Sequence, residues 1–369
     1  MNKNKKRIKI LKILLIVLIA LLAITSIAYV MADKYYNKMN VKPNISQKKD
    51  KLEIDKILEK KEAPLSAEEL KKIEEDKTYD FMEANLEPIQ NKDDVFNILL
   101  IGTDERGDVK GARSDTMMLL SINDKNKEIT LTSFMRDMYV SIPGYGRSKL
   151  NAAYAYGGPD LLKNTLYKNF NVEVDKFVQV DFESFIELFD SIKGIEVEIT
   201  EKERVEINRC IEEINYLKKR PWGTNNIAQS GKIVLENGDQ ALSYARIRKV
   251  GNSDFDRTNR QRGLLGKAFE KVKTMGILEI NDLLNKSLPL VTTNLTKGEC
   301  FSLAINLLKY KDYSTQSLRV PIDGSFSSGK AKRQQVIMVD FNKNIKFLKD
   351  NIYLEKSLEK NAEGGNNQQ

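Results

Sequence analysis

The sequence predicts a layered α/β domain that follows a single N-terminal transmembrane helix. Two patterns support this fold class. Between residues 94 and 310, short apolar runs typical of buried strands alternate with longer amphipathic segments typical of helices. Near the N-terminus, an uncharged apolar run from Ile13 to Val30 follows six basic residues. We therefore expect one membrane segment and one large folded domain.

The N-terminal run has the length of a membrane span. As a helix, Ile13–Val30 would extend roughly 27 Å, close to the thickness of a bilayer's hydrocarbon core. The basic flank favours a cytoplasmic N-terminus, so the rest of the chain should lie outside the cell. A cleaved signal peptide is the alternative, but its apolar region is usually shorter. We predict a cytoplasmic tail at residues 1–12 and an anchor at residues 13–31.

Charged and polar stretches flank the predicted domain. Residues 32–93 are rich in Lys and Glu and poor in aromatic residues, which predicts a charged, partly helical spacer. Residues 311–350 are predicted to form a C-terminal extension packed on the domain, with a helix at Gln334–Asp350. The polar residues 351–369 are predicted to be disordered.

The first three predicted strands lie close together in the sequence. Val95–Ile101 is a continuous apolar run, and Thr116–Ile122 and Ile129–Phe134 follow it. The polar residues 124–127 between the last two runs are typical of a turn, so these runs should form a hairpin. Two further strands are predicted at Lys176–Val180 and Ile195–Ile199.

Helical segments follow these strands. The segments Asn151–Tyr156 and Pro159–Asn169 should form helices that are separated by the glycine pair between them. The polar segment Glu201–Gly231 is expected to be an irregular surface excursion. The remaining predicted helices are Phe182–Ile192, Gly238–Ile247, Arg257–Met275, Ile280–Leu288 and Lys297–Leu308.

Composition limits the chemistry that the protein can perform. The formal net charge of +8 makes an anionic partner plausible. Histidine is absent, which excludes Ser-His-Asp catalysis, Cys-His catalysis and His-ligated metals. Oxygen ligands must then hold any metal ion, which favours Mg²⁺ or Mn²⁺. The two cysteines, Cys210 and Cys300, are compatible either with one disulfide or with two buried thiols.

Acidic and basic residues follow the first strands of the predicted sheet. Asp104 comes directly after the first strand, and Arg113 and Asp115 lead into the second. Arg136 follows the third, at the matching end of the hairpin. Loops at strand ends face a crevice in α/β sheets, so the two aspartates could share a Mg²⁺ ion. The alternative is that each aspartate only caps a turn.

A second basic cluster lies further along the chain. Arg246 and Arg248 end a predicted helix, and Arg257 and Gln261 lie at the start of the next. Guanidinium groups bind two phosphate oxygens at once, and helix N-termini also favour anions, so this cluster predicts a phosphate site. Lys149 could add a further positive charge. The alternative is a basic surface helix that pairs with nearby acids.

These clusters, in this order, resemble the LytR-CpsA-Psr family of wall-polymer ligases. The resemblance extends from about Phe96 to Met275. It rests on the strings NILLIGTDER, RSDTMMLLSIN, RDMYVSIPGYGRSKLNAAYAYGG, VDFESFIELFDSIKGIEVEI, GDQALSYARIRK and DFDRTNRQRGLL.

The resemblance implies an α/β/α sandwich with a central mixed β-sheet and a phosphotransferase activity. Such enzymes move a glycopolymer from an undecaprenyl-pyrophosphate carrier in the membrane to peptidoglycan. Asp104 and Asp115 match the family's Mg²⁺ aspartates and, with Arg113 and Arg136, its catalytic residues. Matching its pyrophosphate-binding residues are Arg113, Arg136, Arg246, Arg248, Arg257 and the motif glutamine Gln261.

A lipid carrier requires an apolar groove. Apolar residues share one side of the helix predicted at residues 182–192 and could line such a groove, although ordinary core packing is the alternative. The candidates are Phe182, Phe185, Ile186, Leu188 and Phe189.

Two other functions would use the same residues. A polyprenyl-pyrophosphate phosphatase would let water replace the acceptor hydroxyl. A non-catalytic receptor for anionic wall polymers would need the arginines but not the paired aspartates. Nucleic acid is not an expected partner, because the anchor would leave only about twelve residues in the cytoplasm.

Overall fold

The computed structural model describes residues 33–42, 94–103, 114–251, 253–331 and 334–354. The predicted anchor, most of the predicted spacer and the tail beyond residue 354 lie outside these residues. Within the described ranges, none of the helices has the length and apolar character needed to cross a bilayer.

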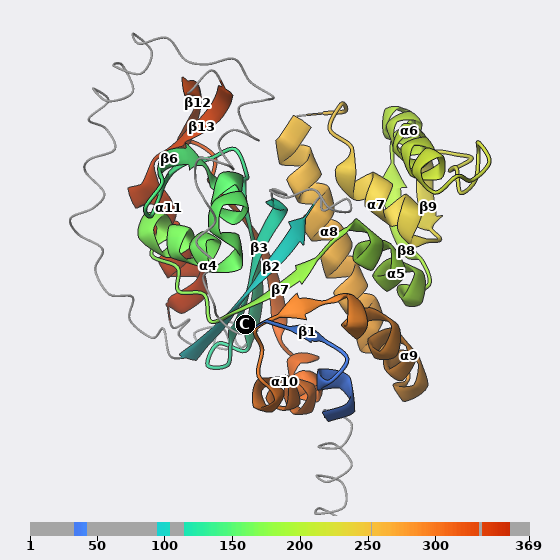
Figure 1. Cartoon of the computed structure of the whole chain (residues 1–369), viewed down its shortest axis with the longest axis horizontal. Helices are drawn as coiled ribbons and strands as arrows, with labels where there is room; N and C mark the ends of the chain where they lie inside the picture. The colour runs from blue at the N-terminus through green and yellow to red at the C-terminus, as the bar shows by residue number, and fades with distance from the viewer. Residues whose placement is uncertain (1–32, 43–93, 104–113, 252, 332–333, 355–369) are drawn as a thin grey trace, which may run out of the picture.

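The described residues contain a central mixed sheet of seven strands, as predicted (Figure 1). Neighbouring strands run parallel in the pairs β1/β10, β7/β2 and β4/β11, and antiparallel in the others. The spatial order is β1 (Asn40–Val41), β10 (Thr292–Thr293), β7 (Lys176–Val180), β2 (Val95–Thr103), β3 (Ser114–Asn123), β4 (Glu128–Phe134) and β11 (Ser314–Val320).

Several strands of this sheet end at the same edge. The predicted hairpin is confirmed as β3 and β4, which pair antiparallel from Met118↔Ser133 to Asn123↔Glu128. Because β2, β4, β7 and β11 all run toward the edge where β3 begins, their C-terminal ends lie together there.

The C-terminal region contributes more to the domain than an extension packed on its surface. Strand β11 completes the central sheet beside β4. Residues 334–350, predicted to be a helix, begin as the strand β13 (Gln334–Val339), which pairs with β12 (Phe326–Ala331). The continuous apolar run of residues 336–339, rich in β-branched side chains, suits a strand, and only Phe341–Leu348 forms an α-helix, α11. A π-helical turn at Lys349–Tyr353 follows it, so residues 351–353, predicted to belong to the disordered tail, are part of a helical turn in which Ile352 and Tyr353 are buried.

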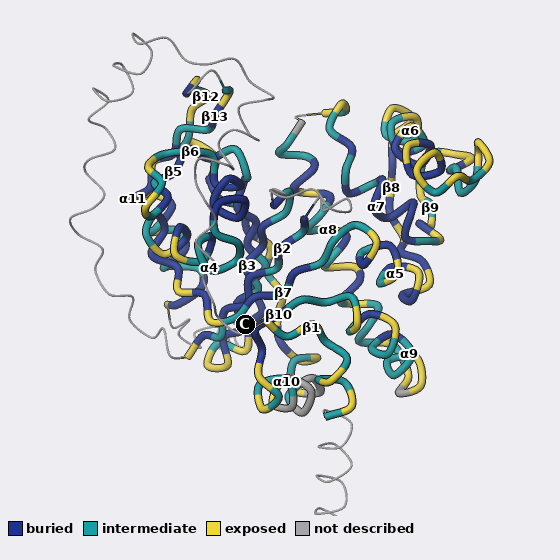
Figure 2. Tube along the Cα trace, in the orientation of Figure 1, coloured by how far each residue is buried: buried dark blue, intermediate teal, exposed yellow. Residues whose placement is uncertain are grey.

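Helices cover both faces of the sheet. On one face, α4 (Leu150–Phe170) and α11 pack against β2 and β3 in the largest apolar core. On the other face, α8 (Ser253–Thr274) and α10 (Lys297–Tyr310) contribute side chains to a smaller core around Ile122 and Ile129. Most residues of β2, β3, β4 and the first turns of α4 are buried (Figure 2).

Helix α4 contains the break that its sequence predicts. Gly157 and Gly158 have non-helical backbone angles, and Gly158 has a φ of +66°. Glycine tolerates this left-handed conformation because it has no Cβ. Before α4, the short hairpin of β5 (Tyr139–Ile142) and β6 (Gly146–Lys149) leads the chain away from β4.

A second apolar core lies beside the sheet, around α8. It joins α8 to α5, α7, α9 and the β8/β9 hairpin. These elements form a wall beside the C-terminal ends of the central strands. Its elements are α5 (Phe182–Ile192), β8 (Ile195–Ile199), α6 (Glu201–Leu217), β9 (Gly231–Leu235), α7 (Gly238–Arg246) and α9 (Ile277–Ser287).

The prediction of an irregular segment at residues 201–231 is wrong for its first half, which forms α6. A capping box of Thr200 and Glu203 starts this helix. Ile207, Cys210, Ile211 and Ile214 follow at helical spacing and are buried. The high content of Glu, Lys and Arg hid this apolar stripe. Cys210 and Cys300 are both free thiols, so they do not form a disulfide with each other.

Candidate functional site

A β-bulge carries the aspartate at the start of β3. Gly102 pairs with Thr116 and Thr103 pairs with Ser114, so Asp115 has no partner on β2. A bulge places an extra residue in one strand and redirects its side chain. Here the bulge lies at the sheet edge where the other strands end, and Asp115 borders a cavity at that edge.

Arg136 lies beside this aspartate. It follows β4, and the preceding residue, Met135, is tied to β11 by a hydrogen bond from its amide to the Val320 carbonyl at 2.9 Å. The Arg136 guanidinium donates from NH1 to Asp115 Oδ1 at 2.5 Å. The structure thus brings together two of the predicted site residues that lie 21 positions apart in the chain.

Two more predicted arginines join this pair through an aspartate that the sequence analysis did not select. Asp254 Oδ2 accepts a hydrogen bond from Arg257 NH2 at 2.9 Å and lies 3.7 Å from Arg136 Nε. Arg248 lies between both carboxylates, with NH2 3.6 Å from Asp115 Oδ1 and Nε 3.8 Å from Asp254 Oδ1. The three guanidinium groups and two carboxylates form one network.

Lys149 reaches this network through Asp137. Its Nζ lies 3.1 Å from Asp137 Oδ1, and the other oxygen of Asp137 lies 3.5 Å from Arg136 Nε. We call Asp115, Asp137, Asp254, Arg136, Lys149, Arg248 and Arg257 the charged cluster. Its four cations outnumber its three carboxylates, which leaves a positive balance for an anionic ligand.

Burial and neighbouring positive charges disfavour the charged form of Arg257. Burial, together with Arg136 and Arg248, lowers the pKa of Arg257 to about 10 although Asp254 opposes this effect, so the guanidinium stays charged at neutral pH. Burial raises the pKa of Asp115, but the positive charges of Arg136, Arg257 and Arg248 outweigh it and hold that pKa below its usual value. An added anion would relieve the repulsion among the arginines.

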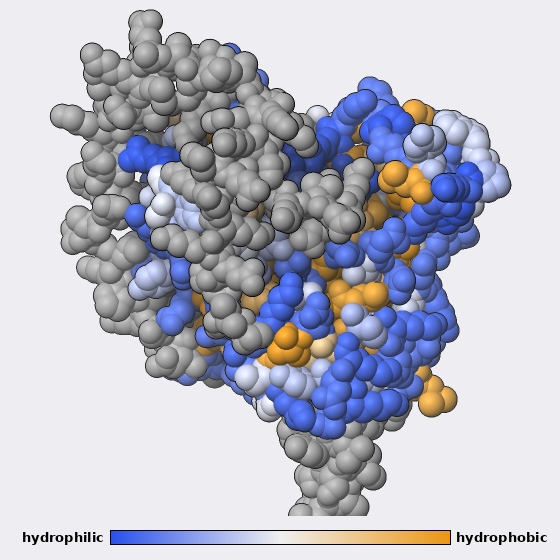
Figure 3. Space-filling model, viewed as in Figure 1, coloured by the Kyte–Doolittle hydropathy of each residue, from blue (hydrophilic) through white to orange (hydrophobic). Residues whose placement is uncertain are grey.

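Four members of the cluster, Asp115, Arg136, Arg248 and Arg257, line a cavity of about 740 Å³. Figure 3 shows apolar surface between the central strands and the helices beside them, bordered by hydrophilic surface. Strands β2, β3 and β7 and helices α5, α7 and α8 supply the apolar walls. These walls consist of Leu100, Ile101, Met118, Val178, Val180, Phe182, Phe185, Leu188, Leu242, Leu264 and Leu265.

The predicted groove residues divide between the cavity and the core. Phe182, Phe185 and Leu188 line the cavity. Ile186 and Phe189 instead pack into the cores around α7 and α6, where their side chains are 5% and 2% exposed. Ile186 and Phe189 follow Phe182 and Phe185 by one helical turn, and the Phe189 ring stacks on the Phe185 ring at 4.3 Å, so they pack behind the residues that line the cavity.

Two of the predicted phosphate ligands occupy different positions from the others. Arg246 lines the cavity away from the ion pairs of the charged cluster: its guanidinium stacks over the Phe182 ring at 4.7 Å and lies 4.0 Å from Glu213. Gln261 lines the cavity but donates its Nε2 hydrogen bond to the Ala245 carbonyl at 3.1 Å.

Sequence reasoning missed several residues of this site. Arg209 and Glu213 on α6 line the cavity, but they fall within the segment that was expected to be irregular and were not predicted as site residues. Asp137 and Asp254 were inside the quoted motifs but received no role. The available signal was that Asp137 directly follows Arg136 and that Asp254 lies one helical turn before Arg257.

Comparison with known proteins shows the family to which the chain belongs. The family model described as the LytR_cpsA_psr family matches residues 57–348. The chain belongs to this family.

Curated relatives and solved structures agree with that membership. The TagU protein of Bacillus cereus (strain AH820), named a polyisoprenyl-teichoic acid–peptidoglycan teichoic acid transferase, is 33% identical over 69% of this chain and 78% of its own. A solved structure of TagT bound to LIIa-WTA is 26% identical, with a TM-score of 0.55, and covers 73% of this chain and 92% of its own. The protein gbs0355 of Streptococcus agalactiae is 26% identical, with a TM-score of 0.59, over 70% and 87%.

The metal predicted for this LytR_cpsA_psr site depends on residues beyond the charged cluster. Asp104 and Arg113 lie outside the described residues, and the described ranges contain no group of three or more Cys, Asp or Glu side chains arranged for a metal. Mg²⁺ commonly takes only one or two protein carboxylates and fills its other positions with water and phosphate oxygens. Asp115 at the cavity mouth fits that limited role.

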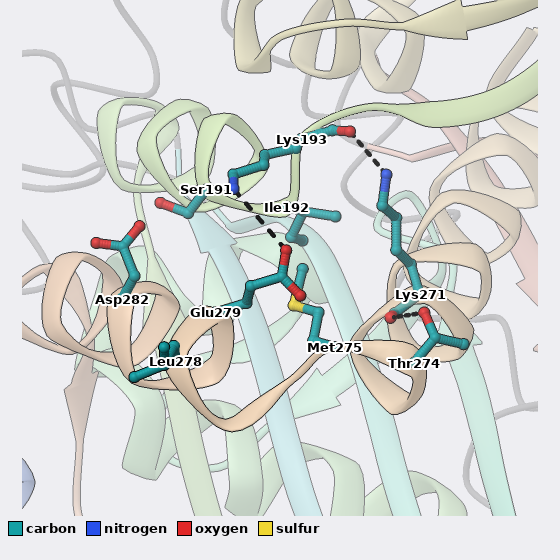
Figure 4. Close-up of a pocket in the computed structure, with 9 residues that line it drawn as sticks. All are labelled: Ser191, Ile192, Lys193, Lys271, Thr274, Met275, Leu278, Glu279 and Asp282. Carbon is teal, nitrogen blue, oxygen red and sulfur yellow. Dashed lines mark hydrogen bonds and ion pairs between the residues drawn. The ribbon is translucent and has the colours of Figure 1, made fainter.

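A second cavity of about 380 Å³ lies between the ends of α5, α8 and α9 (Figure 4). Lys271 Nζ donates to the carbonyl oxygens of Lys193 and Gly194 at 2.7 and 2.6 Å, which caps the end of α5. Lys193 lies 3.9 Å from Glu279. Both lysines therefore have partners, and this cavity lacks the cluster of arginines that marks the larger one.

Proposed function

We propose that this protein is a phosphotransferase that moves a glycopolymer from an undecaprenyl-pyrophosphate carrier to peptidoglycan. One observation supports this proposal most strongly: a single cavity is lined both by clustered guanidinium groups and by many aliphatic and aromatic side chains. A polyprenyl pyrophosphate has the same division between a polyanionic head and an apolar chain. The names of the relatives TagU and TagT agree with this class of substrate.

The cations of the charged cluster would bind the pyrophosphate. Arg136, Arg248 and Arg257 come from three separate segments and converge on two carboxylates, so their positions are set before the ligand arrives. Fixed donors stabilise charge that develops during phosphoryl transfer without further reorganisation. The pyrophosphate would replace some of the contacts that the aspartates make with the arginines. It would give the buried guanidinium groups negatively charged partners.

The proposed reaction exchanges one P–O bond for another. A hydroxyl oxygen of peptidoglycan attacks the phosphorus that bears the glycopolymer, and a new O–P bond forms. The bond from that phosphorus to the bridging oxygen breaks, and polyprenyl monophosphate leaves with the electron pair. The hydroxyl proton passes to water or to a carboxylate, for which Asp104 is the candidate from the sequence. Arg136 and Arg257 would stabilise the leaving phosphate.

We also propose Mg²⁺ as the cofactor, with Asp115 and Asp104 as its protein ligands. When bound, the ion would neutralise charge on the pyrophosphate oxygens. Removal of Mg²⁺ with a chelator should weaken pyrophosphate binding in the parent protein but have little effect in Asp115→Asn. Equal chelator sensitivity in both proteins would exclude Asp115 as a ligand.

The same proposal includes an extracytoplasmic location. The apolar residues 13–30 and their basic flank support a membrane anchor with the cluster outside the cell. The described structure begins at Asp33, three residues beyond that run, and joins the sheet edge through β1. Labelling of single introduced cysteines in intact cells with an impermeant reagent tests this location.

A reconstituted reaction tests the proposed function. The full chain in detergent would receive a polyprenyl-pyrophosphate-linked glycopolymer, peptidoglycan and Mg²⁺. We expect covalent attachment of the polymer to peptidoglycan and release of polyprenyl monophosphate. Arg257→Met should reduce the rate by at least about a hundredfold, as loss of a charge-stabilising donor commonly does.

Arg262→Met is the matched control, because Arg262 lies on the same helix but does not line the cavity. It should retain most of the activity. Release of monophosphate that is independent of peptidoglycan would support a phosphatase instead. Binding without any product would support a receptor for wall polymers.

A further inference from the structure

Three large exposed side chains lie at and just beyond the C-terminal end of α6. The Tyr216 and Trp222 side chains are 84% and 83% exposed, and Leu217 between them is 60% exposed. Large aromatic side chains seldom stay in water without a partner, and tryptophan and tyrosine are typical of binding surfaces. We call these three residues the aromatic cap.

The loop after α6, which carries Trp222, forms hydrogen bonds with two buried carboxylates. Glu212 accepts hydrogen bonds from the Gly223 amide at 2.9 Å and from Asn226 Nδ2 at 2.7 Å. Asp239, on α7, accepts from Arg220 NH2 and Asn225 Nδ2, both at 2.7 Å. Both acids are less than 10% exposed.

The backbone of the segment is held as well. The Arg220 amide donates to the Asn215 carbonyl at 2.8 Å, and Asn215 Nδ2 donates to the Thr224 carbonyl at 2.8 Å. The aromatic side chains are therefore presented on a prearranged loop. A partner would not have to order the loop on binding, which lowers the entropy lost.

The position of the cap relates it to the proposed reaction. Arg209, Cys210 and Glu213 of α6 line the large cavity, and Tyr216 follows within one helical turn of Glu213. Figure 1 places the end of α6 on the opposite side of the molecule from residues 33–41, which follow the proposed anchor. Figure 2 shows this tip as exposed. The cap thus follows the cavity-lining residues of α6 and lies far from residues 33–41.

We propose that the aromatic cap binds the glycan strand of the peptidoglycan acceptor. This inference rests on the proposed function, because it assigns the acceptor to a surface beside the same cavity. A pyranose ring has an apolar face of C–H bonds that packs on an aromatic ring, while its hydroxyl edge stays in water. Trp222 and Tyr216 provide such rings, and the exposed Lys219 beside them provides a cation for the carboxylates of the peptide stems.

The chain offers a direct optical test, because Trp222 is its only tryptophan. Soluble, uncrosslinked peptidoglycan strands would be added to the full chain in detergent. We expect a saturable change in the tryptophan emission. In co-sedimentation with insoluble peptidoglycan, Trp222→Ala should bind about tenfold more weakly, which corresponds to the loss of one central interface residue. Trp222→Phe should recover part of the binding.

Tyr167→Ala is the matched control, since Tyr167 is another exposed aromatic residue but lies on α4. It should bind peptidoglycan like the parent. Parental binding by Trp222→Ala, or no binding by the parent itself, would overturn the proposal. An emission change with phospholipid vesicles but not with glycan would indicate a membrane surface, and a dimer that Trp222→Ala abolishes would indicate a second copy; either result would also overturn it.

Inorganic pyrophosphate binding separates this inference from the proposed function. Trp222→Ala should bind pyrophosphate like the parent, because the charged cluster does not include the cap. If the parent fails to bind pyrophosphate, the proposed function fails whatever the cap binds. If only the glycan result is negative, the cap proposal alone is rejected.

Discussion

The side chain of Gln261 holds the main chain of Ala245, through the hydrogen bond from its Nε2 to the carbonyl oxygen at 3.1 Å. The preceding residue of α8, Arg260, donates from NH2 to the Ile247 carbonyl at 2.6 Å. These two bonds lie on either side of Arg246 and fix the segment that leads to Arg248. Helix α8 therefore positions Arg246, at the end of α7, and the segment that leads to Arg248, as well as carrying Arg257.

This relationship predicts an indirect role for Gln261. Gln261→Leu keeps a side chain of similar size but removes the donor, so Arg248 should lose its fixed position. We expect inorganic pyrophosphate to bind about fivefold to tenfold more weakly, in line with the loss of one hydrogen bond. Isothermal titration calorimetry measures this affinity.

Gln261→Glu should bind pyrophosphate more weakly still. An ionised carboxylate cannot donate to the Ala245 carbonyl and places a negative charge on the cavity wall. Circular dichroism should show the parental helix content in both variants. Parental affinity in Gln261→Leu would contradict the positioning role.

Asp115 should make stability depend on pH in the acid range. Its folded-state pKa lies below its usual value, because Arg136 and its neighbours outweigh the effect of burial. The carboxylate therefore contributes stability above the unfolded pKa of about 4 and loses it as the pH falls through the lower folded value. Urea unfolding at pH 7 should show Asp115→Asn to be less stable than the parent. That difference should shrink toward pH 3, and a difference independent of pH would reject this account.

Tyr353 should tie the C-terminal segment to the sheet. Its hydroxyl accepts a hydrogen bond from Asn97 Nδ2 at 2.9 Å, and Asn97 Oδ1 accepts another from Ser121 at 2.6 Å, all within the core. Tyr353→Phe should lower the free energy of unfolding by about 1 kcal/mol, as measured with urea. Pyrophosphate binding should not change.

The same residue predicts sensitivity to alkali. Burial raises the pKa of Tyr353 above its usual value. The unfolded chain therefore ionises first, so stability is complete below about pH 10 and falls as the pH rises further. Tyr353→Phe should lose less stability than the parent between pH 9 and pH 11. Identical alkaline profiles would contradict this prediction.

The apolar wall should distinguish lipid from inorganic ligands. Phe185 lines the large cavity on α5, and Phe185→Ala should weaken binding of a polyprenyl pyrophosphate by about tenfold through lost apolar contact. Inorganic pyrophosphate should bind normally, because it needs only the charged cluster. The control is Leu278→Ala, which alters the second cavity. A larger effect from Leu278→Ala would place the lipid there instead.

Much of the fold could be predicted because its signals are local. The apolar runs of β2, β3 and β4, the turn between the last two and the glycine break in α4 each depend on a few neighbouring residues. The errors had the same origin. In α6 the charged residues concealed a buried stripe at helical spacing, and in β13 the short apolar run could not be separated from the helix that follows it.

The candidate site was predictable in its residue types but not in its arrangement. Arg246 and Arg248 are two positions apart and looked equivalent in the sequence, yet Arg246 stacks on Phe182 while Arg248 lies between Asp115 and Asp254. Similarly, Gln261 binds a carbonyl rather than standing free for a ligand.

The sequence alone determined that the chain has an apolar N-terminal run, alternating strands and helices, no histidine and a set of arginines and aspartates suited to phosphate. Only the tertiary structure decided which of these charges meet. The bulge at Asp115, the strand end before Arg136 and the first turn of α8 are far apart in the chain and converge at one sheet edge. The physical reason is that strand pairing and apolar packing set the distances between these segments, and those interactions depend on residues remote from the charges themselves.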